Sequence, residues 1–253
     1  MRRSRKAVSR KRLRGFESHP LRQSSIQEKQ TQKSFEIRNN NIVQKLLLGI
    51  DEAGRGCVIG PLVLAGFLIE DRDEIIERLN DMGVNDSKLL IPRRRDELCR
   101  EIMQVSQTFR IIKIRPQELN SASINSLEIK YSSRIIDFLK PHTVYLDVPA
   151  RGVGIRSYCD KVRNSCLRPS IEIIGGNKMD SKNVLVAAAS ILAKTEREKT
   201  IGRLKKKYGD FGSGYTSDAK TIMWLKKWYK DNGSWPSIVR IKWKTLGKPG
   251  FQF

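Results

Sequence analysis

The pattern of apolar and polar positions predicts strands alternating with helices from about residue 42 onward. Short apolar runs bounded by Gly, Pro or acidic residues are typical of buried strands, and apolar residues spaced three and four apart are typical of helices that cover a sheet. Strands are expected at 45–50, 61–69, 109–114, 143–146 and 171–174. Helices are expected at 74–82, 92–105, 126–139, 151–164, 183–206 and 216–229. This mixture predicts an α/β fold with helices on both faces of the sheet.

The helix expected at 183–206 divides the chain further. Its first half, residues 184–193, is nearly all small or apolar and should be buried, whereas its second half is charged. We expect one domain at 41–206, followed by a C-terminal helical region at 207–253. Trp224 and Trp228 of that region share one helical face, which favours packing over base stacking.

Charge is distributed unevenly along the 253 residues, whose net charge is +22. Residues 1–40 contain twelve Lys and Arg against three Glu, and residues 194–253 contain fifteen basic against five acidic residues. The stretch between them is close to balanced, with twenty-two basic and nineteen acidic residues. A surplus of this size favours a polyanionic partner, of which nucleic acid is the usual one.

The scarcity of histidines, of paired cysteines and of long apolar stretches disfavours several classes of protein. It has only two histidines, which disfavours a hydrolase that needs a histidine base and a His-rich zinc site. Its four cysteines form no CxxC pair, so we expect reduced thiols in a cytoplasmic protein. No uninterrupted apolar stretch reaches membrane-spanning length.

The most informative segment is 49–56, with the sequence GIDEAGRG. Two adjacent carboxylates, Asp51 and Glu52, follow a buried strand, where they are costly to hold together unless a cation neutralises them. Carboxylate oxygens suit Mg²⁺ or Mn²⁺. Because neighbouring residues of a regular strand point to opposite faces, the two acids can share a site only if the strand is frayed at its end.

Two further acids are candidates for the same site. Asp147 ends the apolar run 143–146, and strand ends of an open α/β sheet are where ligands gather. Asp180 precedes the long helix. Taken alone, Asp147 could equally be a turn residue, and Asp180 is better explained as a helix cap. Together, the four acids fit a pair of divalent ions roughly 4 Å apart.

Five motifs, in order, make residues 45–230 resemble the type 2 ribonuclease H family, ribonuclease HII, in its archaeal and eukaryotic version. They are GIDEAGRG at 49–56, GVNDSK at 83–88, YLDVP at 145–149, AAASILAK at 187–194 after Asp180, and GSGYTSD at 212–218. A single motif of this kind would be suggestive, but five in the same order are specific.

The resemblance implies an RNase H-like fold, with a five-stranded mixed sheet flanked by helices and a C-terminal helical region. It implies that residues 41–206 are the catalytic domain and that residues 207–253 bind substrate. It implies hydrolysis of the RNA strand of RNA–DNA hybrids and incision of DNA at embedded ribonucleotides, leaving 5′-phosphate and 3′-hydroxyl ends. By resemblance, the metal ligands would be Asp51, Glu52, Asp147 and Asp180. The nucleic-acid contacts would be Gly54, Arg55 and Gly56 at the 2′-hydroxyl and Tyr215 on a deoxyribose, with Lys88 and Lys194 as candidate phosphate contacts and surface lysines as the equal alternative.

Two rival functions explain part of the pattern. A non-catalytic basic RNA-binding protein accounts for the charge but leaves four acids as an electrostatic penalty, and a metal-dependent nuclease for branched DNA could share the same sheet. Residues 250–253 (GFQF) loosely resemble a sliding-clamp motif, so a clamp is a candidate partner. We expect the protein to be a monomer.

The basic leader, residues 1–40, has few apolar residues and should be disordered. Residues 15–18 (GFES) match one reading frame of a common tRNA T-arm sequence, which suggests that the leader is an upstream tRNA gene read through from a misplaced start codon. Intact mass of the native protein tests this hypothesis. We expect a chain shorter than the full sequence, and a chain that starts at Met1 would refute it.

Overall fold

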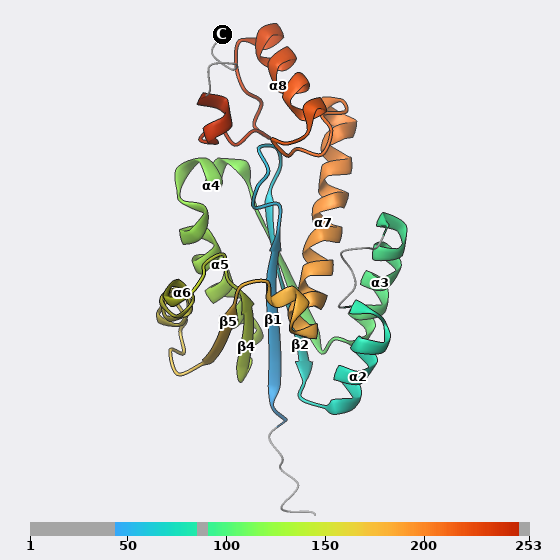
Figure 1. The fold of residues 1–253 in the computed structure, drawn as a ribbon, viewed down its shortest axis with the longest axis vertical. Coiled ribbons are helices and arrows are strands. Elements are labelled where there is room, and N and C mark those ends of the chain that lie inside the picture. Colours follow the sequence, from blue (N-terminus) through green and yellow to red (C-terminus); the bar gives the residue numbers. More distant parts are fainter. Residues whose placement is uncertain (1–43, 85–90, 248–253) are drawn as a thin grey trace, which may run out of the picture. The chain divides into compact units, whose positions relative to one another are not determined.

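A computed structural model describes residues 44–84 and 91–247, and within them the sheet has five strands (Figure 1). The strands lie in the order β3-β2-β1-β4-β5, and β1 is antiparallel to β2 and parallel to β4, which confirms the expected mixed sheet. Their bounds are β1 Leu46–Ala53, β2 Leu62–Glu70, β3 Thr108–Ile114, β4 Thr143–Asp147 and β5 Glu172–Gly176.

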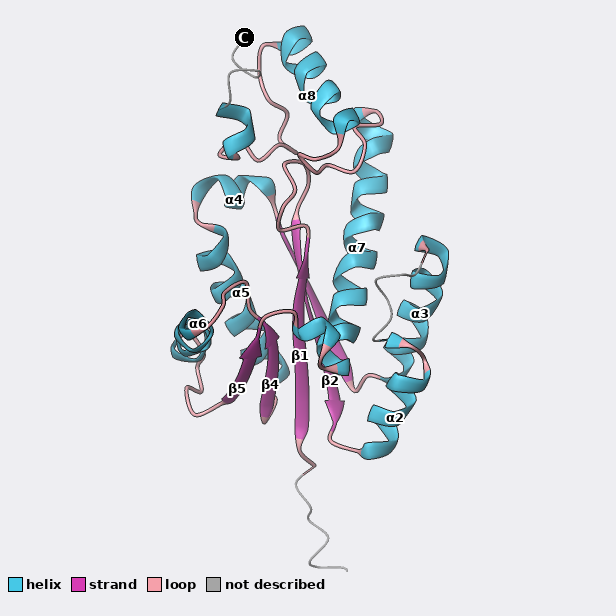
Figure 2. Ribbon diagram, in the orientation of Figure 1, coloured by secondary structure: helices cyan, strands magenta, loops and turns pink. Residues whose placement is uncertain are grey.

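Helices flank this sheet on both sides (Figure 2). They are α2 Asp73–Asp81, α3 Pro92–Val105, α4 Pro116–Ser121, α5 Ile124–Leu139, α6 Val153–Asn164, α7 Val184–Tyr208 and α8 Ala219–Asn232, with short 3₁₀ turns η2 Met179–Ser181 and η3 Lys244–Gly247. The predicted helices are all present, and α4 was not predicted. The sequence pattern identified Pro116 only as the end of a strand, but proline is also favourable in the first turn of a helix.

Alternation along β1 divides the core between the two faces of the sheet. Leu48 and Ile50 pack with residues of α5 and α6, whereas Leu47 and Ala53 pack with residues of α2, α3 and α7. Side chains of odd-numbered residues of β1 therefore point toward α7 and those of even-numbered residues toward α5. This alternation determines which side of the sheet each carboxylate of the strand approaches.

Helix α7 lies unusually close to β1 at Gly49. A Cβ at this position would overlap the backbone carbonyl of Leu185 and would lie 2.6 Å from the nitrogen of Val186. The alanines that follow on α7, Ala187, Ala188 and Ala189, are also buried. Small residues on both elements thus allow the backbones to approach each other, as glycine in a strand interior commonly does.

A third cluster of buried residues lies in the C-terminal region. Phe211, Leu225 and Val239 pack there with Val58 and Ile59, which come from the loop between β1 and β2. Trp224 contacts both Phe211 and Trp228, with ring centroids 5.6 and 5.1 Å apart. These contacts confirm that the tryptophans of α8 serve packing.

Some sequence predictions fall outside the described residues. They concern Lys88, the basic leader at 1–40 and the tail at 250–253. The boundary between a catalytic domain and a C-terminal region remains a prediction. Within 44–84 and 91–247, none of the helices has the length and apolar character needed to cross a membrane.

Replacing Gly49 with alanine should destabilise the protein by about 3 kcal/mol, because the methyl group has no space unless α7 moves away from β1. The midpoint of urea unfolding measures this change. Gly202→Ala is the matched control on α7, where a Cβ meets no atom within 4 Å, so it should stabilise the helix by about 0.5–1 kcal/mol. Equal midpoints for the two variants would contradict the close approach.

Candidate active site

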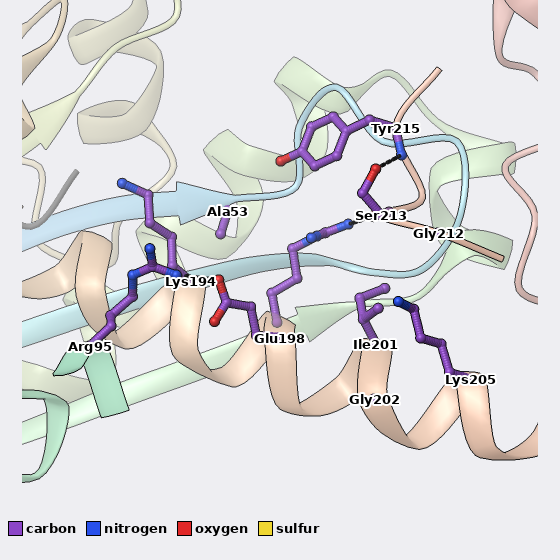
Figure 3. A pocket seen from close by; sticks show the side chains of 11 residues that line it. Ala53, Arg95, Lys194, Glu198, Ile201, Gly202, Lys205, Gly212, Ser213 and Tyr215 are labelled. Atoms are coloured by element: carbon purple, nitrogen blue, oxygen red, sulfur yellow. Dashed lines mark hydrogen bonds and ion pairs between the residues drawn. The ribbon is translucent and has the colours of Figure 1, made fainter. Parts of the chain in front are cut away.

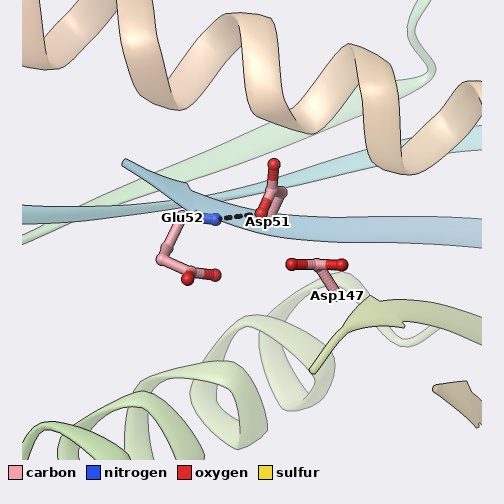
Figure 4. A group of neighbouring side chains, drawn as sticks. All are labelled: Asp51, Glu52 and Asp147. Atoms are coloured by element: carbon pink, nitrogen blue, oxygen red, sulfur yellow. Dashed lines mark hydrogen bonds between the residues drawn. The ribbon is translucent and has the colours of Figure 1, made fainter. Parts of the chain in front are cut away.

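Three carboxylates converge where β1 and β4 end (Figure 4). Asp51 and Glu52 belong to β1 and Asp147 is the last residue of β4. One oxygen of each carboxylate lies within 4.8 Å of the others, a spacing that could hold a metal ion. The structure therefore brings together three of the four acids that the sequence indicated.

The expectation that β1 is frayed at Asp51 and Glu52 was wrong. The strand continues to Ala53, and both acids are paired with β2, opposite Ala65 and Leu64. Pairing with β4, in contrast, stops at Ile50. Since β1 extends beyond β4, its edge on that side is open, and side chains from opposite faces can meet around it. The physical reason for the shared site is this overhang of one strand.

Asp147 is held in place by the segment that follows β5. The backbone N–H of Met179 donates a hydrogen bond of 2.6 Å to Asp147 Oδ1. Asp180 is the next residue, in η2, and its negative charge raises the pKa of Asp51, although it is not one of the three converging acids. The N-cap of α7 is Asn183, whose side chain accepts from Leu185 and Val186, so Asp180 does not cap that helix.

Burial and neighbouring negative charges hinder the ionisation of Asp51 and Glu52. Burial raises the pKa of Asp51 to about 7, and the charge of Asp147 acts in the same direction. The polar hydroxyl of Ser190 on α7 is buried close to Asp51 and opposes this rise in the pKa of Asp51. Burial also raises the pKa of Glu52 well above its ordinary value, and the charge of Asp51 adds to the effect. Carboxylates in this condition fit a divalent cation, whose charge would offset both penalties.

The loop after β1 lies against two segments of the C-terminal half. Gly54 has a φ of +91°, and a Cβ there would lie 2.7 Å from Arg197 Cδ. At Gly56 a Cβ would lie 3.7 Å from the ring of Tyr215. Cys57 and Tyr215 form an isolated antiparallel β-bridge. The structure thus places Gly56 beside Tyr215 and Gly54 beside Arg197.

Two buried arginines support this loop, and sequence reasoning missed both. Arg197 Nη2 donates to Cys57 Sγ at 2.8 Å and to the Ser213 carbonyl at 3.3 Å, and its guanidinium lies 5.1 Å from the centre of the Tyr215 ring. Arg240 Nε donates to the Gly60 carbonyl at 2.9 Å, and burial lowers its pKa to about 10. Neither position has a local pattern that distinguishes it from a surface arginine.

A fourth buried carboxylate also escaped prediction. Glu128 of α5 is 2% exposed, forms an ion pair with Arg55 and accepts a hydrogen bond of 3.4 Å from the Tyr158 hydroxyl. Burial raises its pKa, and the charge of Arg55 opposes that rise. The sequence shows only an ordinary glutamate in a helix, so no local signal could have identified it.

A groove of about 570 Å³ lies between α7 and the 212–215 segment (Figure 3). It is lined by eleven residues: Ala53, Arg95, Lys194, Arg197, Glu198, Ile201, Gly202, Lys205, Gly212, Ser213 and Tyr215. Lys194 is half-buried and lines this groove together with Ala53, the last residue of β1. Its position is compatible with the role of a phosphate contact, whereas Lys88 lies outside the described residues.

In the metal-free protein, Asp51→Asn should raise the free energy of unfolding by about 2 kcal/mol at pH 8. The pKa of Asp51 is about 7 in the folded protein, whereas the ordinary pKa of an aspartate is 3.8. The unfolded chain therefore loses this proton at lower pH than the folded protein does, and the wild-type protein loses stability as the pH rises from about 4 to 7 and above. The gain should therefore disappear near pH 4. Urea unfolding between these pH values checks it, with the exposed Glu77→Gln as control. Parallel pH curves for wild type and Asp51→Asn would contradict a buried cluster of like charges.

Comparison with known proteins assigns the family. The family model described as Ribonuclease HII matches residues 48–246. Ribonuclease HII of Pyrococcus furiosus is 41% identical over 204 residues, which are 79% of this chain and 89% of that protein.

Two solved structures resemble the chain closely. Ribonuclease H2 of Pyrococcus horikoshii has a TM-score of 0.74 and 36% identity, over 80% of this chain and 95% of that one. Ribonuclease HII of Archaeoglobus fulgidus, solved in complex with PCNA, has a TM-score of 0.71 and 42% identity, over 78% of this chain and 95% of that one. Both the sheet with its converging acids and these matches lead to one conclusion: the chain belongs to the ribonuclease HII family.

Proposed function

We propose that the protein hydrolyses the RNA strand of RNA–DNA hybrids and incises DNA at embedded ribonucleotides, leaving 5′-phosphate and 3′-hydroxyl ends. The observation that carries this proposal is the convergence of Asp51, Glu52 and Asp147 beside a glycine-rich loop in a chain of the ribonuclease HII family. Family membership supports a type 2 ribonuclease H, and the geometry supports metal-assisted cleavage of a phosphodiester.

Asp51, Glu52 and Asp147 would hold the divalent ions, with Asp180 as a fourth ligand from η2. Mg²⁺ or Mn²⁺ bound there would activate water for attack and stabilise the charge on the leaving oxygen. The chain's own contribution is to keep the acids fixed before substrate arrives. Asp51 Oδ1 accepts the N–H of Glu52 at 2.7 Å, and Asp147 accepts that of Met179, so two carboxylates are oriented by the backbone.

Recognition of RNA would rest on the loop at Gly54, Arg55 and Gly56. The 2′-hydroxyl is the group that distinguishes RNA from DNA, and main-chain atoms can reach it where no Cβ obstructs them. Tyr215, 37% exposed beside Gly56, would pack on the sugar on the DNA side of the junction. A deoxyribose suits this contact because it lacks the hydroxyl that the ring would have to desolvate.

The charge of the chain supports binding of a nucleic-acid duplex. Lys194 would contact a phosphate from the groove beside β1, and the strongly basic composition would strengthen binding at low salt. The sliding clamp is a further proposed partner, since an Archaeoglobus relative has been solved with PCNA. We also propose that the protein acts as a monomer in the cytoplasm, where its four buried free thiols stay reduced.

An end-labelled DNA duplex with one ribonucleotide tests the proposed function. Incubated with Mg²⁺ or Mn²⁺, the wild-type protein should cut next to the ribonucleotide and leave 5′-phosphate and 3′-hydroxyl ends. Asp51→Asn should lower the cleavage rate by about 1,000-fold or more, because it removes a ligand from the metal site, while duplex binding persists. Product mapping on denaturing gels and anisotropy binding measure the two effects.

Glu77→Gln, exposed on α2, should cleave like wild type. Cleavage that is unchanged in Asp51→Asn would refute the role of this acid, and binding of hybrids without any cleavage would favour the non-catalytic alternative. Activity on branched all-DNA duplexes, with none at the ribonucleotide, would favour the branched-DNA nuclease instead.

A further inference from the structure

The guanidinium of Arg55 is engaged with helix α5. Its Nη1 is ion-paired with Glu128 and its Nη2 donates to the Asn125 side-chain oxygen. These partners are three residues apart on one face of the helix, so a single planar guanidinium can contact both. The main-chain carbonyl of Arg55 accepts a hydrogen bond of 3.3 Å from Arg240 Nη1. Arg55 is thus held through both its side chain and its backbone.

The burial of the two partners differs sharply. The side chain of Glu128 is 3% exposed, whereas that of Arg55 is 33% exposed. Glu128 Oε1 is buried and accepts no hydrogen bond from the described residues, and Oε2 has only Arg55 and a long contact to Tyr158. The buried carboxylate therefore depends on Arg55 for charge compensation, while Arg55 could turn to solvent if it lost Glu128.

We propose that Glu128 is a positioning residue that fixes the loop at 54–56 through Arg55, and that the guanidinium of Arg55 is this tie rather than a phosphate ligand. The inference rests on the proposed function, since it concerns how the loop would recognise a ribonucleotide. The loop is then held by three attachments: Arg55 to α5, Arg240 to the backbone carbonyl of Arg55, and Arg197 to the thiol of Cys57 just after the loop.

This arrangement has a consequence for recognition. Guanidinium groups that contact phosphate add affinity for any duplex, whereas a fixed main chain adds affinity only where a 2′-hydroxyl is present. Glu128 therefore contributes to selectivity between a ribonucleotide and a deoxyribonucleotide. Loss of the tie should affect that selectivity before it affects general binding to DNA.

The charge-neutral double variant Arg55→Met/Glu128→Gln separates the two roles of Arg55. Binding to an all-DNA duplex is measured by anisotropy in EDTA over a range of salt concentrations. If Arg55 only ties the loop, the slope of log K against log salt should equal that of wild type. A phosphate contact would instead reduce the slope by about 0.9, and this outcome would overturn the proposal.

Selectivity is the second measurement, taken as the ratio of affinities for a duplex with one ribonucleotide and an all-DNA duplex. Glu128→Gln should lower this ratio by about threefold to tenfold, and the double variant should lower it by the same factor because the tie is already lost. Arg55→Lys should behave likewise, since a lysine cannot contact both partners with a planar fork. The controls are Glu77→Gln and Arg78→Met, two exposed residues of α2. An unchanged ratio in Glu128→Gln would overturn the proposal.

Urea unfolding of the two single variants and the double variant tests the tie without nucleic acid. Arg55→Met should destabilise the protein more than the double variant does, because it leaves Glu128 buried without a cation. Additive effects would overturn the tie even if hybrids are cleaved as proposed. The opposite outcome is also distinguishable. If Arg55 and Glu128 are coupled in stability but the wild-type protein shows no selectivity for ribonucleotides, the contact between them is confirmed and the proposed function is refuted.

Discussion

Close packing of α7 against β1 at Gly49 positions most of the groups that form the site. A strand without a side chain at this point allows the helix backbone to approach more closely than side-chain packing would permit. The position of α7 then determines several others. Its start places η2 and Asp180 near the end of β1, its middle carries Ser190 beside Asp51, and Arg197 further along reaches the loop after β1.

Buried acidic and buried basic side chains gather in two neighbouring places in this protein, the acids at the ends of β1 and β4 and the arginines at the loop after β1. Asp51, Glu52 and Asp147 lie close together at the ends of β1 and β4, and burial together with the neighbouring negative charges raises the pKa values of Asp51 and Glu52. In the loop that follows β1, Cys57 and Gly60 accept hydrogen bonds from the buried residues Arg197 and Arg240. Buried acids that repel one another favour a cation, whereas buried guanidinium groups that donate to carbonyl oxygens hold a loop in one conformation. The two arrangements suit a site that holds ions beside a segment that must keep its shape.

The C-terminal region contributes to the site through the same loop. Val58 and Ile59 pack into the C-terminal core, Cys57 pairs with Tyr215, and Ile59 pairs with Val239. The polypeptide that leaves the acidic cluster is thus built into the region that carries the tyrosine. A loop fixed at so many points has little freedom to lose on binding, which is the condition under which main-chain contacts can be selective.

Sequence patterns predicted the five strands and every helix of the sheet's two faces except α4, and the family motifs predicted the mixed sheet and the residues of β1 and β4 that carry the acids. These features follow from local apolar periodicity and from motifs that are contiguous in the chain. How Asp51 and Glu52 share a site could not be predicted from local patterns, because the extension of β1 beyond β4 is a relation between strands far apart in sequence. The same holds for Glu128, Arg197 and Arg240. Each is an ordinary charged residue in its own segment, and it becomes significant only because folding buries it against the loop at 54–60.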